Sequence, residues 1–595
     1  MSAVAAAQSA DISVDIALSA IRCDGFGCGS SVSRASLVFP VSASLPYRPL
    51  IEALPFFARR YTGDIAYLHS VGPDNGVDSD TGAARARYSL MGMRAYRVTA
   101  DPPDHATAIG YLGYDDGVSR WAWFDLWLVE DHRDRTVHAV AMGRLTDADA
   151  QIKELNAAWS EALEAGAHDY DVPAEDPVGG MRNDPRESRS DPICEIEVHA
   201  DQSRDGYIEA VEHMQRHMRD GDIYVANMSM RFFVRSPRSP IDVFRRLYAD
   251  SPSPYAAYLD FGGNEDNGDN SGDDRGTGCL RTDRLGTAAM DSGDPETKAR
   301  RVIVSSSPER FFSIWDGTVT TEPIKGTRPR GKNPAEDAAL RADLHASDKE
   351  RSELLMVTDL ERNDMNRICE PGSVTVPEFE VIRMFPHVFH TVSVVEGRLR
   401  PSMAVSEALR LMSPGGSITG TPKRRATEII AECERSPRGV YTGSLGYVGT
   451  DPDEWLRGGA AGQLAGDGSD DCAGHGSGRE TDIRPSHTVM HSVMHPITRS
   501  DSAEARPVCD LSIIIRAAVC EPGTVKESGD FGRSGRFDYM VGAGGGVTLD
   551  SDPAAEYDEA VHKARAVLDA LGAAAVADTL GTDADSTTVS GAGDQ

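Results

Sequence analysis

The sequence predicts an α+β fold in which large, mostly antiparallel β-sheets carry helices on their outer faces. First, strand-like apolar runs and amphipathic helical patterns both recur along the 595 residues. Second, few strands are separated by a single helix, as the repeated βαβ unit of a parallel sheet requires. Third, polar and acidic stretches interrupt these runs and resemble loop insertions. A doubly wound parallel sheet is therefore disfavoured.

The individual elements follow from local periodicity. Tyr207, Ile208, Val211, Met214 and Met218 repeat at helical spacing and predict a helix over 203–219. Strands are expected at 106–111, 127–130, 136–141, 223–233, 256–261, 302–304, 311–314, 317–321, 439–450, 511–519 and 537–542. Further helices are expected at 147–165, 241–249, 334–346, 348–361, 404–412, 423–433 and 553–571.

Composition predicts the organisation of the chain, because segments with few large apolar side chains cannot offset the entropy of ordering them. The predicted parts are a disordered N-terminus at 1–12, an N-terminal region at 13–165, a linker at 166–192, a main region at 193–574 with acidic insertions at 262–300 and 457–508, and a disordered tail at 575–595.

The chain is strongly acidic, with 61 Lys and Arg residues against 93 Asp and Glu residues and a net charge of -32. Such a field repels phosphate, so neither a nucleic acid nor an anionic membrane is expected as a partner. Only eight of the basic residues are lysines. An acidic, lysine-poor composition suits a cytoplasm with molar salt, where charge repulsion is screened, and a halophilic source is one hypothesis. A GC-rich genome accounts for the preference for Arg equally well.

The nine cysteines are scattered and contain no C-x-x-C pair, so neither a disulfide framework nor a zinc site is indicated. The N-terminus lacks the basic and apolar regions of a signal peptide, and no apolar run is long enough to cross a membrane. A cytoplasmic location is expected.

Two neighbouring segments carry the first chemical motif. Ser-Ser-Pro-Glu-Arg-Phe-Phe at 306–312 is followed by Thr-Glu-Pro-Ile-Lys-Gly-Thr-Arg at 321–328, which places Glu309 and Lys325 on two neighbouring strand ends. Gly326 leaves room for a ligand to approach the backbone. A hairpin with surface charges is the alternative interpretation.

Two charged helices carry the second motif. Glu353 lies in the charged helix that begins at 348, and a buried carboxylate there suits Mg²⁺, which binds one or two carboxylates together with waters and substrate oxygens. Asp552 is placed to cap a second helix that begins at Pro553. Glu559 and Lys563 share one face of that helix. The alternatives are a solvated charged face and a weak surface ion pair.

Two glycine-rich segments suggest close approach of backbone to a ligand. Ser-Pro-Gly-Gly-Ser-Ile-Thr-Gly-Thr-Pro-Lys at 413–423 opens a helix with Pro422 at its first position, which makes an anion site or a simple cap. Gly-Ala-Gly-Gly-Gly at 542–546 follows a strand, and its spacing does not match a dinucleotide fingerprint.

Taken in order, these motifs resemble those of the chorismate-binding enzymes, which include anthranilate synthase component I, aminodeoxychorismate synthase component I, isochorismate synthase and salicylate synthase. The resemblance covers residues 203–571, and Gly-Tyr-Leu-Gly-Tyr-Asp at 110–115 is similar to the family's variable first part. It implies two large, roughly orthogonal antiparallel sheets with the active site between them. The main region would be the chorismate-binding catalytic region, and 13–165 the N-terminal region of component I.

The same resemblance implies the roles of individual residues. Glu353 and Glu559 match two Mg²⁺ ligands, and the metal would bind the C1 carboxylate of chorismate. His390 matches a histidine near the enolpyruvyl group, although a lone histidine also fits a hydrogen-bonded core position. The positions that match substrate-binding residues are Gly326, Thr327, Thr419, Tyr441, Arg516, Gly542, Ala543, Gly544 and Lys563.

The residue after Pro-Ile separates the members of the family. Anthranilate synthases usually carry Ala there, and aminodeoxychorismate synthases carry Lys, as this chain does at Lys325. A partly desolvated amine beside a cation keeps a nucleophilic fraction near neutral pH. The resemblance thus implies that Lys325 attacks C2 of chorismate while Glu309 protonates the leaving C4 oxygen. The expected product is 4-amino-4-deoxychorismate, for 4-aminobenzoate and folate biosynthesis.

One residue keeps alternatives open. Where ammonia-using synthases usually have Gln and isochorismate-forming enzymes have Lys, this chain has Val225. The alternatives are an anthranilate synthase component I and a non-catalytic chorismate-binding subunit. No Gly-x-Cys-x-Gly nucleophile elbow is present, so a separate glutamine amidotransferase subunit is expected to supply ammonia and to form a heterodimer with this chain.

Overall fold

The computed structural model describes residues 41–69, 87–104, 107–115, 118–169, 196–261, 300–385, 388–452, 508–520 and 536–573. The predicted termini at 1–12 and 575–595 lie outside these residues, as do nearly all of the linker at 166–192 and of the two acidic insertions. Among the described residues, 20 strands are linked by hydrogen bonds, and every pairing between them is antiparallel. The predicted antiparallel architecture is confirmed.

The first sheet joins the N-terminal strands to those that flank the long C-terminal helix. Strand pairing gives its order from one edge to the other. The strands in that order are β7 (Glu197–Ala200), β8 (Val225–Ser236), β20 (Phe537–Val547), β19 (Ala517–Cys520), β10 (Arg301–Ser307), β9 (Tyr255–Phe261), β2 (Asp64–Leu68), β3 (Tyr88–Thr99), β5 (Ser119–Asp131), β6 (Thr136–Ala141) and β1 (Val41–Leu45).

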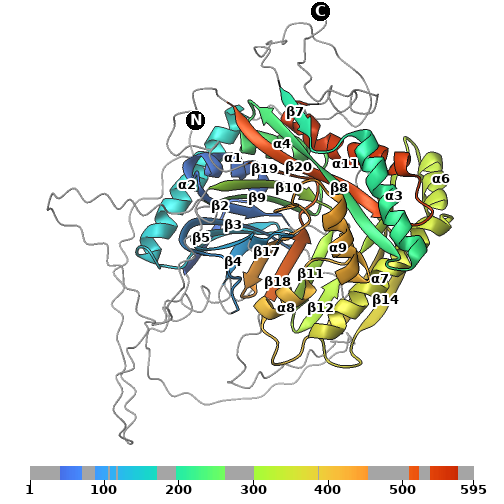
Figure 1. The fold of residues 1–595 in the computed structure, drawn as a ribbon. Helices are drawn as coiled ribbons and strands as arrows, with labels where there is room; N and C mark the ends of the chain where they lie inside the picture. The colour runs from blue at the N-terminus through green and yellow to red at the C-terminus, as the bar shows by residue number, and fades with distance from the viewer. Residues whose placement is uncertain are drawn as a thin grey trace, which may run out of the picture. The chain divides into compact units, whose positions relative to one another are not determined.

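The second sheet branches from β5, because the start of that long strand pairs with β4 while its end pairs with β6. The strands that follow β5 are β4 (Ala108–Leu112), β17 (Ser444–Gly449), β18 (Val508–Ile513), β11 (Arg310–Trp315), β12 (Thr318–Thr321), β15 (Val388–Arg398), and β13 (Ile324–Pro329) with β14 (Thr375–Met384) on either edge of β15. Strands of the two sheets run in clearly different directions in Figure 1. A short strand, β16 (Gly420–Thr421), pairs with the start of β8.

Three apolar clusters define the layers. One cluster lies between the two sheets and includes Leu259 from β9 and Leu445 from β17. A second covers the other face of the first sheet, and a third covers the outer face of the second sheet. The helices that contribute to the second cluster are α1 (Leu50–Arg60), α2 (Ala148–Asp169), α3 (Arg204–Asp220), α4 (Pro240–Asp250), α9 (Lys423–Cys433) and α11 (Pro553–Leu571). Those of the third cluster are α7 (Asp348–Ile368) and α8 (Val405–Met412), and α6 (Pro334–His345) packs beside β13.

Local sequence signals explain where most helices begin. Ser203, Ser239, Ser347 and Asp552 each accept a hydrogen bond from a backbone N–H of the first turn of α3, α4, α7 and α11. The expected cap at Asp552 is confirmed. The prediction for Pro422 was wrong by one position, because Pro422 adopts an extended conformation as the N-cap and α9 begins at Lys423.

Two predicted strands differ from the structure for a local reason. The run 511–519 is split into β18 and β19, and Arg516 between them has a φ of 48°. The run 439–450 becomes a strand only at Ser444, because Gly439 and Thr442 have positive φ values in the preceding turn. Both breaks leave non-strand backbone beside the sheets, and both lie close to residues of the candidate site. No helix of the described residues is long and apolar enough to cross a membrane.

Candidate active site

The strand arrangement brings Glu309 and Lys325 to one end of a β-hairpin. β12 and β13 both pair with β15 and are separated by Glu322 and Pro323. β11 pairs with β12, so Glu309, the residue before β11, and Lys325, the second residue of β13, come to the same end of the hairpin. The expected placement on neighbouring strand ends thus agrees with the register. Burial raises the pKa of Glu309, and the positive charge of Lys325 is close enough to oppose this rise.

Glu309 is a buried carboxyl group that is held in place by backbone and side-chain contacts. Its backbone N–H donates to Ser307 Oγ at 3.2 Å, and its carbonyl oxygen accepts from Ile513 N at 3.1 Å. Burial raises the pKa of its carboxyl group above the ordinary value, against a hydrogen bond with Ser417. A buried carboxyl with a raised pKa is suited to donating a proton.

Carboxylates and lysines from α7 and α11 meet beside this hairpin. Lys563 Nζ lies 2.6 Å from the Glu559 carboxylate, and Lys349 Nζ lies 3.8 Å from both Glu353 and Glu556. Burial raises the pKa of Glu353, and the charge of Glu559 raises it further. Desolvation by itself would raise the pKa of Glu559, but the Lys563 ammonium outweighs it and the pKa is lowered. Two carboxylates that repel each other in this way form a set of oxygen ligands that a divalent cation would stabilise.

The glycines of β20 form the floor on which these side chains converge. Lys563 Nζ donates to the Gly544 carbonyl oxygen at 3.1 Å. A Cβ atom added to Gly545 would lie 3.3 Å from Glu556 Oε2 and 3.4 Å from Lys563 Nζ, and one added to Gly546 would lie 3.4 Å from Lys325 Nζ. The glycine run therefore leaves open the space between Lys325 and the charged face of α11.

His390 is fixed against the strand that carries Lys325. Thr327 and His390 are cross-strand partners, and Thr327 Oγ1 lies 2.9 Å from His390 Nδ1. Burial, together with the nearby charge of Arg516, lowers the pKa of His390 to about 4. The ring is therefore neutral at neutral pH. Gly326, which lies between Lys325 and Thr327 in the sequence, has a φ of 87°, a conformation that favours glycine.

Arg516 lies at the break between β18 and β19, where most of its guanidinium group is shielded from water. Desolvation lowers the pKa of its guanidinium group, and its Nη1 donates to Ser251 Oγ at 3.4 Å. Among the described residues, no carboxylate lies within ion-pair distance of it. A guanidinium in this situation is suited to binding the carboxylate of a ligand through two parallel hydrogen bonds.

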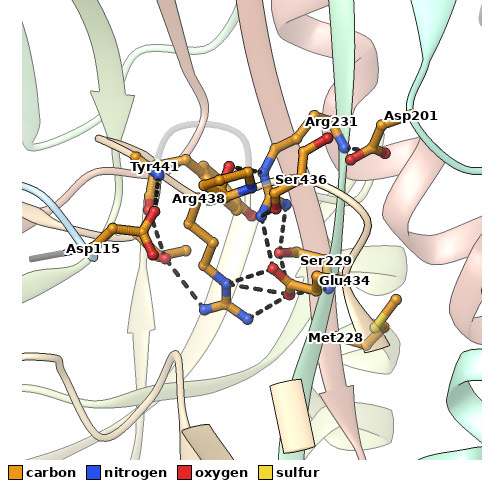
Figure 2. Close-up of polar contacts among 12 residues, drawn as sticks. Asp115, Asp201, Met228, Ser229, Arg231, Glu434, Ser436, Arg438 and Tyr441 are labelled. Atoms are coloured by element: carbon orange, nitrogen blue, oxygen red, sulfur yellow. Dashed lines mark hydrogen bonds and ion pairs between the residues drawn. The ribbon is translucent and has the colours of Figure 1, made fainter. Parts of the chain in front are cut away.

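Tyr441 packs flat on Gly542, because a Cβ atom there would lie 2.2 Å from the Tyr441 ring. Beneath it lies a buried ion-pair network, drawn in Figure 2, in which Arg231 and Arg438 each contact the Glu434 carboxylate at 2.7 Å. The Tyr441 N–H donates to the Arg438 carbonyl oxygen at 3.0 Å. The network therefore anchors the turn that presents Tyr441 to β20.

The Asp115 carboxylate accepts a hydrogen bond from the Gly439 backbone N–H, and the Arg438 guanidinium stacks over the Tyr114 ring at 4.4 Å. The segment 110–115 thus touches the same turn from the other side (Figure 2). This contact gives a structural role to a motif that the sequence only matched by resemblance.

Not every sequence-predicted residue reaches the centre of the site. Thr419 is buried, and its hydroxyl donates to the Gly415 carbonyl oxygen at 2.8 Å, within its own turn. Val225 pairs with Thr421 at the start of β8, and Ala543 faces the apolar cluster beneath the helices. The turn still contributes to the site, because Ser417 holds Glu309.

Three contacts were missed by the sequence-based prediction. Lys349 was recognisable in principle, because it precedes Glu353 by four residues on a helix and such pairs face each other. Ser417 and Glu361, whose carboxyl oxygen lies 2.6 Å from Thr321 Oγ1, had no such signal. Their partners are distant in the sequence, and only the folded chain brings them together.

Comparison with known proteins agrees with the family resemblance of the motifs. A family described as chorismate binding enzyme matches residues 62–267, 293–454 and 504–569, well over half of the chain. An aminodeoxychorismate synthase of Streptomyces pristinaespiralis is 38% identical over 258 residues, which are 43% of this chain and 31% of that protein. The chain thus spans about a third of that relative. An anthranilate synthase component 1 of Haloarcula marismortui is 28% identical over 554 residues, covering 86% of this chain and 88% of the relative.

Solved structures agree with the fold. Anthranilate synthase component I from Streptococcus pneumoniae aligns with a TM-score of 0.52 at 22% identity and covers 82% of this chain and 93% of its own. MenF, the menaquinone-specific isochorismate synthase from Escherichia coli, aligns with a TM-score of 0.55 at 14% identity, covering 89% and 94%. At these identities the likeness shows the fold alone. The family match, which covers the strands and helices that carry the site, shows that this chain belongs to the chorismate-binding enzymes.

Proposed function

We propose that this chorismate-utilising enzyme is the component I of an aminodeoxychorismate synthase, which converts chorismate and ammonia to 4-amino-4-deoxychorismate and water. The observation that carries the proposal is the position of Lys325. Its ammonium group faces the open backbone of Gly546 and lies within electrostatic reach of Glu309, Glu353 and Glu559. An amine in this position reaches a substrate bound between β13 and the charged face of α11.

The proposed reaction uses Lys325 as a nucleophile and Glu309 as a general acid. The amine of Lys325 attacks C2 of chorismate, both ring double bonds shift, and the C4 hydroxyl leaves as water after Glu309 protonates it. Ammonia then attacks C4, the double bond returns, and Lys325 departs from C2. The raised pKa of Glu309 supports its role, because burial favours the protonated carboxyl group that a general acid requires.

The substrate carboxylates have two candidate partners. Arg516 offers a guanidinium without a carboxylate partner among the described residues, and Gly326 with Thr327 offers backbone and hydroxyl groups beside His390. Glu353 and Glu559 would hold Mg²⁺, whose charge would neutralise a carboxylate of chorismate. Because His390 is neutral, its ring would bind the enolpyruvyl group by hydrogen bonding rather than as a cation.

Product analysis tests the proposal directly. Purified protein is incubated with chorismate, Mg²⁺ and ammonium, and the products are identified by mass spectrometry. The expected product is 4-amino-4-deoxychorismate. Replacing Lys325 with Ala is expected to lower its formation by at least about a hundredfold, because a covalent nucleophile is removed. The control is Lys332→Ala, which removes an exposed lysine seven residues further on.

Two outcomes would overturn the proposal. Formation of anthranilate without any lyase would identify ortho amination, and a Lys325→Ala variant with a near wild-type rate would remove the covalent mechanism. The first outcome is the specific alternative, since the relatives with long alignments include anthranilate synthase component 1 of Haloarcula marismortui and of Streptomyces coelicolor.

We also propose that ammonia reaches this chain from glutamine through a separate amidotransferase subunit. The purified chain is then expected to form product with ammonium but not with glutamine alone. Product formation from glutamine at a rate similar to that with ammonium would show that the chain itself hydrolyses glutamine, and would contradict this part of the proposal.

A further inference from the structure

A cluster of three side chains joins α3 to α9 at the surface, outside the candidate active site. His213 and His217 lie one turn apart on α3, and Glu432 lies near the end of α9. The two helices pack against each other, as Figure 1 shows. We infer that His213, His217 and Glu432, called the α3–α9 cluster below, bind one divalent transition-metal ion of the Zn²⁺ type and staple the two helices together.

The distances within the α3–α9 cluster fit a tetrahedral ion. The two Nε2 atoms lie 3.3 Å apart, and His213 Nε2 lies 3.8 Å from Glu432 Oε2. One ligand atom from each of the three residues lies within 4.8 Å of the others. Two ligands of a tetrahedral Zn²⁺, each bound at about 2.0–2.2 Å, lie about 3.3–3.6 Å apart. The histidine pair already has this spacing, and the Glu432 carboxylate, whose side chain is half-exposed, lies only slightly beyond it from His213.

A carboxylate outside the α3–α9 cluster holds one histidine in the tautomer that binds a metal. The Nδ1 atom of His217 lies 2.7 Å from Asp222 Oδ2. A carboxylate only accepts, so Nδ1 carries the proton and the Nε2 lone pair faces His213. A carboxylate that orients a histidine in this way is the usual outer partner of a zinc ligand. Asp222 follows the glycine that ends α3, so the position of the carboxylate is set by the helix itself.

Without a metal, the same atoms form a chain of hydrogen bonds. Arg216 Nη2 lies 3.2 Å from His213 Nδ1, and a guanidinium only donates, so the His213 proton must then reside on Nε2 and point at His217. Metal binding requires that this proton leave and that Arg216 swing away. Arg216 is exposed, so its side chain can turn toward solvent. Arg216 therefore competes with the metal.

Further charged groups beside the α3–α9 cluster come from α9. Arg425 lies 3.7 Å from Glu432 Oε1 and 3.5 Å from Asp222 Oδ2, so it holds both carboxylates near the histidines. It also pairs with Glu428 at 3.1 Å. Two carboxylates close to two imidazoles favour a divalent ion over a monovalent one. Nitrogen ligands favour Zn²⁺, Co²⁺ or Ni²⁺ over Mg²⁺, which prefers oxygen.

The metal ion would connect two helices that pack on the same strand. α3 and α9 both pack on β8, and α9 begins directly after β16, which pairs with the start of that strand. An ion bound across the helices therefore restrains the segment 413–422 that holds Glu309 through Ser417. The expected consequence is a higher thermal midpoint of the whole chain with the metal than without it.

Cobalt binding to the full chain tests the inference. Protein stripped with a chelator is titrated with Co²⁺ in excess Mg²⁺, and the visible absorption of tetrahedral cobalt and the number of equivalents bound are measured. The sequence has further histidines at 487, 491 and 495, which could also bind cobalt. The readout is therefore the difference in cobalt binding between the wild type and each variant. His213→Ala and Glu432→Gln are each expected to lose one equivalent or to weaken binding at least tenfold. The matched control is His345→Ala, an exposed histidine on α6.

Two further variants separate a metal site from a hydrogen-bond chain. Asp222→Asn is expected to weaken binding by about 10–100-fold, because the outer carboxylate no longer orients His217. If the cluster binds metal, Arg216→Ala is expected to tighten cobalt binding, because Arg216 competes for His213. If the three side chains only form hydrogen bonds with one another, Arg216→Ala would lower the stability of the protein and leave its cobalt binding unchanged. The same stoichiometry and spectrum in wild type, His213→Ala and Glu432→Gln would overturn the inference. Because all these side chains lie at the surface, circular dichroism in chelator is expected to show that the variants fold.

Discussion

Glu361 is a buried carboxyl group whose protonation state can be worked out from its neighbours. Thr321 Oγ1 lies 2.7 Å from the Phe311 carbonyl oxygen and 2.6 Å from Glu361 Oε2. A hydroxyl has one proton, and the carbonyl oxygen only accepts, so the second contact requires that Glu361 donates. Burial also raises the pKa of Glu361 to about 8. Both observations indicate a neutral acid.

We therefore expect Glu361→Gln to stabilise the protein at neutral and alkaline pH, because the amide N–H₂ replaces the O–H donor. In the wild type, the folded state keeps a proton that the unfolded state has lost above pH 4.5, so the free energy of unfolding falls as pH rises from about 4.5 to about 8. The difference in free energy of unfolding between the variant and the wild type is expected to be larger at pH 7.5 than at pH 5, by on the order of 2–3 kcal/mol in favour of the variant. Urea unfolding at several pH values measures this.

The control for Glu361→Gln is Asp359→Asn on the same helix. Asp359 forms an exposed ion pair with Arg362, and such pairs contribute about 1 kcal/mol or less. Parallel pH profiles for wild type and Glu361→Gln would show that Glu361 is already ionised in the folded state.

His390 is expected to remain neutral throughout the physiological range. Burial lowers its pKa to about 4, so the folded state does not bind a proton between pH 6.5 and 4 while the unfolded state does. The contribution of His390 to the free energy of unfolding therefore decreases as pH falls through this window. NMR of the ring Cε1 proton is expected to show no titration between pH 5.5 and 8. A midpoint near 6.5 would contradict the burial of this ring.

At the scale of elements, glycines decide how closely the strands and helices of the site approach. Gly326 has a φ of 87°, and an added Cβ atom would lie 2.9 Å from Leu344 Cδ1 of α6. Gly221 at the end of α3 has a similar φ of 83°, and an added Cβ atom would meet nothing within 4 Å. An alanine at either position would be strained by the positive φ. Only at Gly326 would the added Cβ atom also collide with a neighbouring side chain.

Gly221→Ala is expected to lower the free energy of unfolding by about 1 kcal/mol and to leave the rate of chorismate conversion unchanged. Gly326→Ala is expected to cost more and to lower that rate at least tenfold, because the contact with α6 displaces the strand that carries Lys325. Thermal unfolding and steady-state rates of both variants check this. Equal rates for the two variants would mean that β13 tolerates the displacement.

At the scale of the whole molecule, charge repulsion is expected to make stability depend on salt. The net charge is -32, and the Debye length falls from about 10 Å at 0.1 M salt to about 3 Å at 1 M. We expect the thermal midpoint to rise by several degrees as KCl is raised from about 0.1 to 2 M, within this screening range. The rise is expected to be smaller at pH 5.5, where fewer carboxylates are charged. Full stability in dilute buffer at pH 8 would contradict the halophilic hypothesis.

Much of the fold and part of the site were predictable because they depend on local patterns. Apolar periodicity placed α3 and α11, and the polar residues before them act as caps in the structure. The irregular order of strands and helices predicted antiparallel sheets, which the pairing confirms. Motif order also indicated that Lys325, Glu353 and Glu559 belong to one site. Their roles as nucleophile and metal ligands stay predictions that the experiments above address.

By itself, the sequence determined the family, the antiparallel α+β class and the segments from which the site is built. Only the tertiary structure decided which side chains meet between these segments. The proton on Glu361, the support of Glu309 by Ser417, the Arg231–Glu434–Arg438 network and the α3–α9 cluster all depend on partners from separate elements. Periodicity and capping report on neighbours within a few residues, whereas burial and pairing across sheets arise only when the chain has packed.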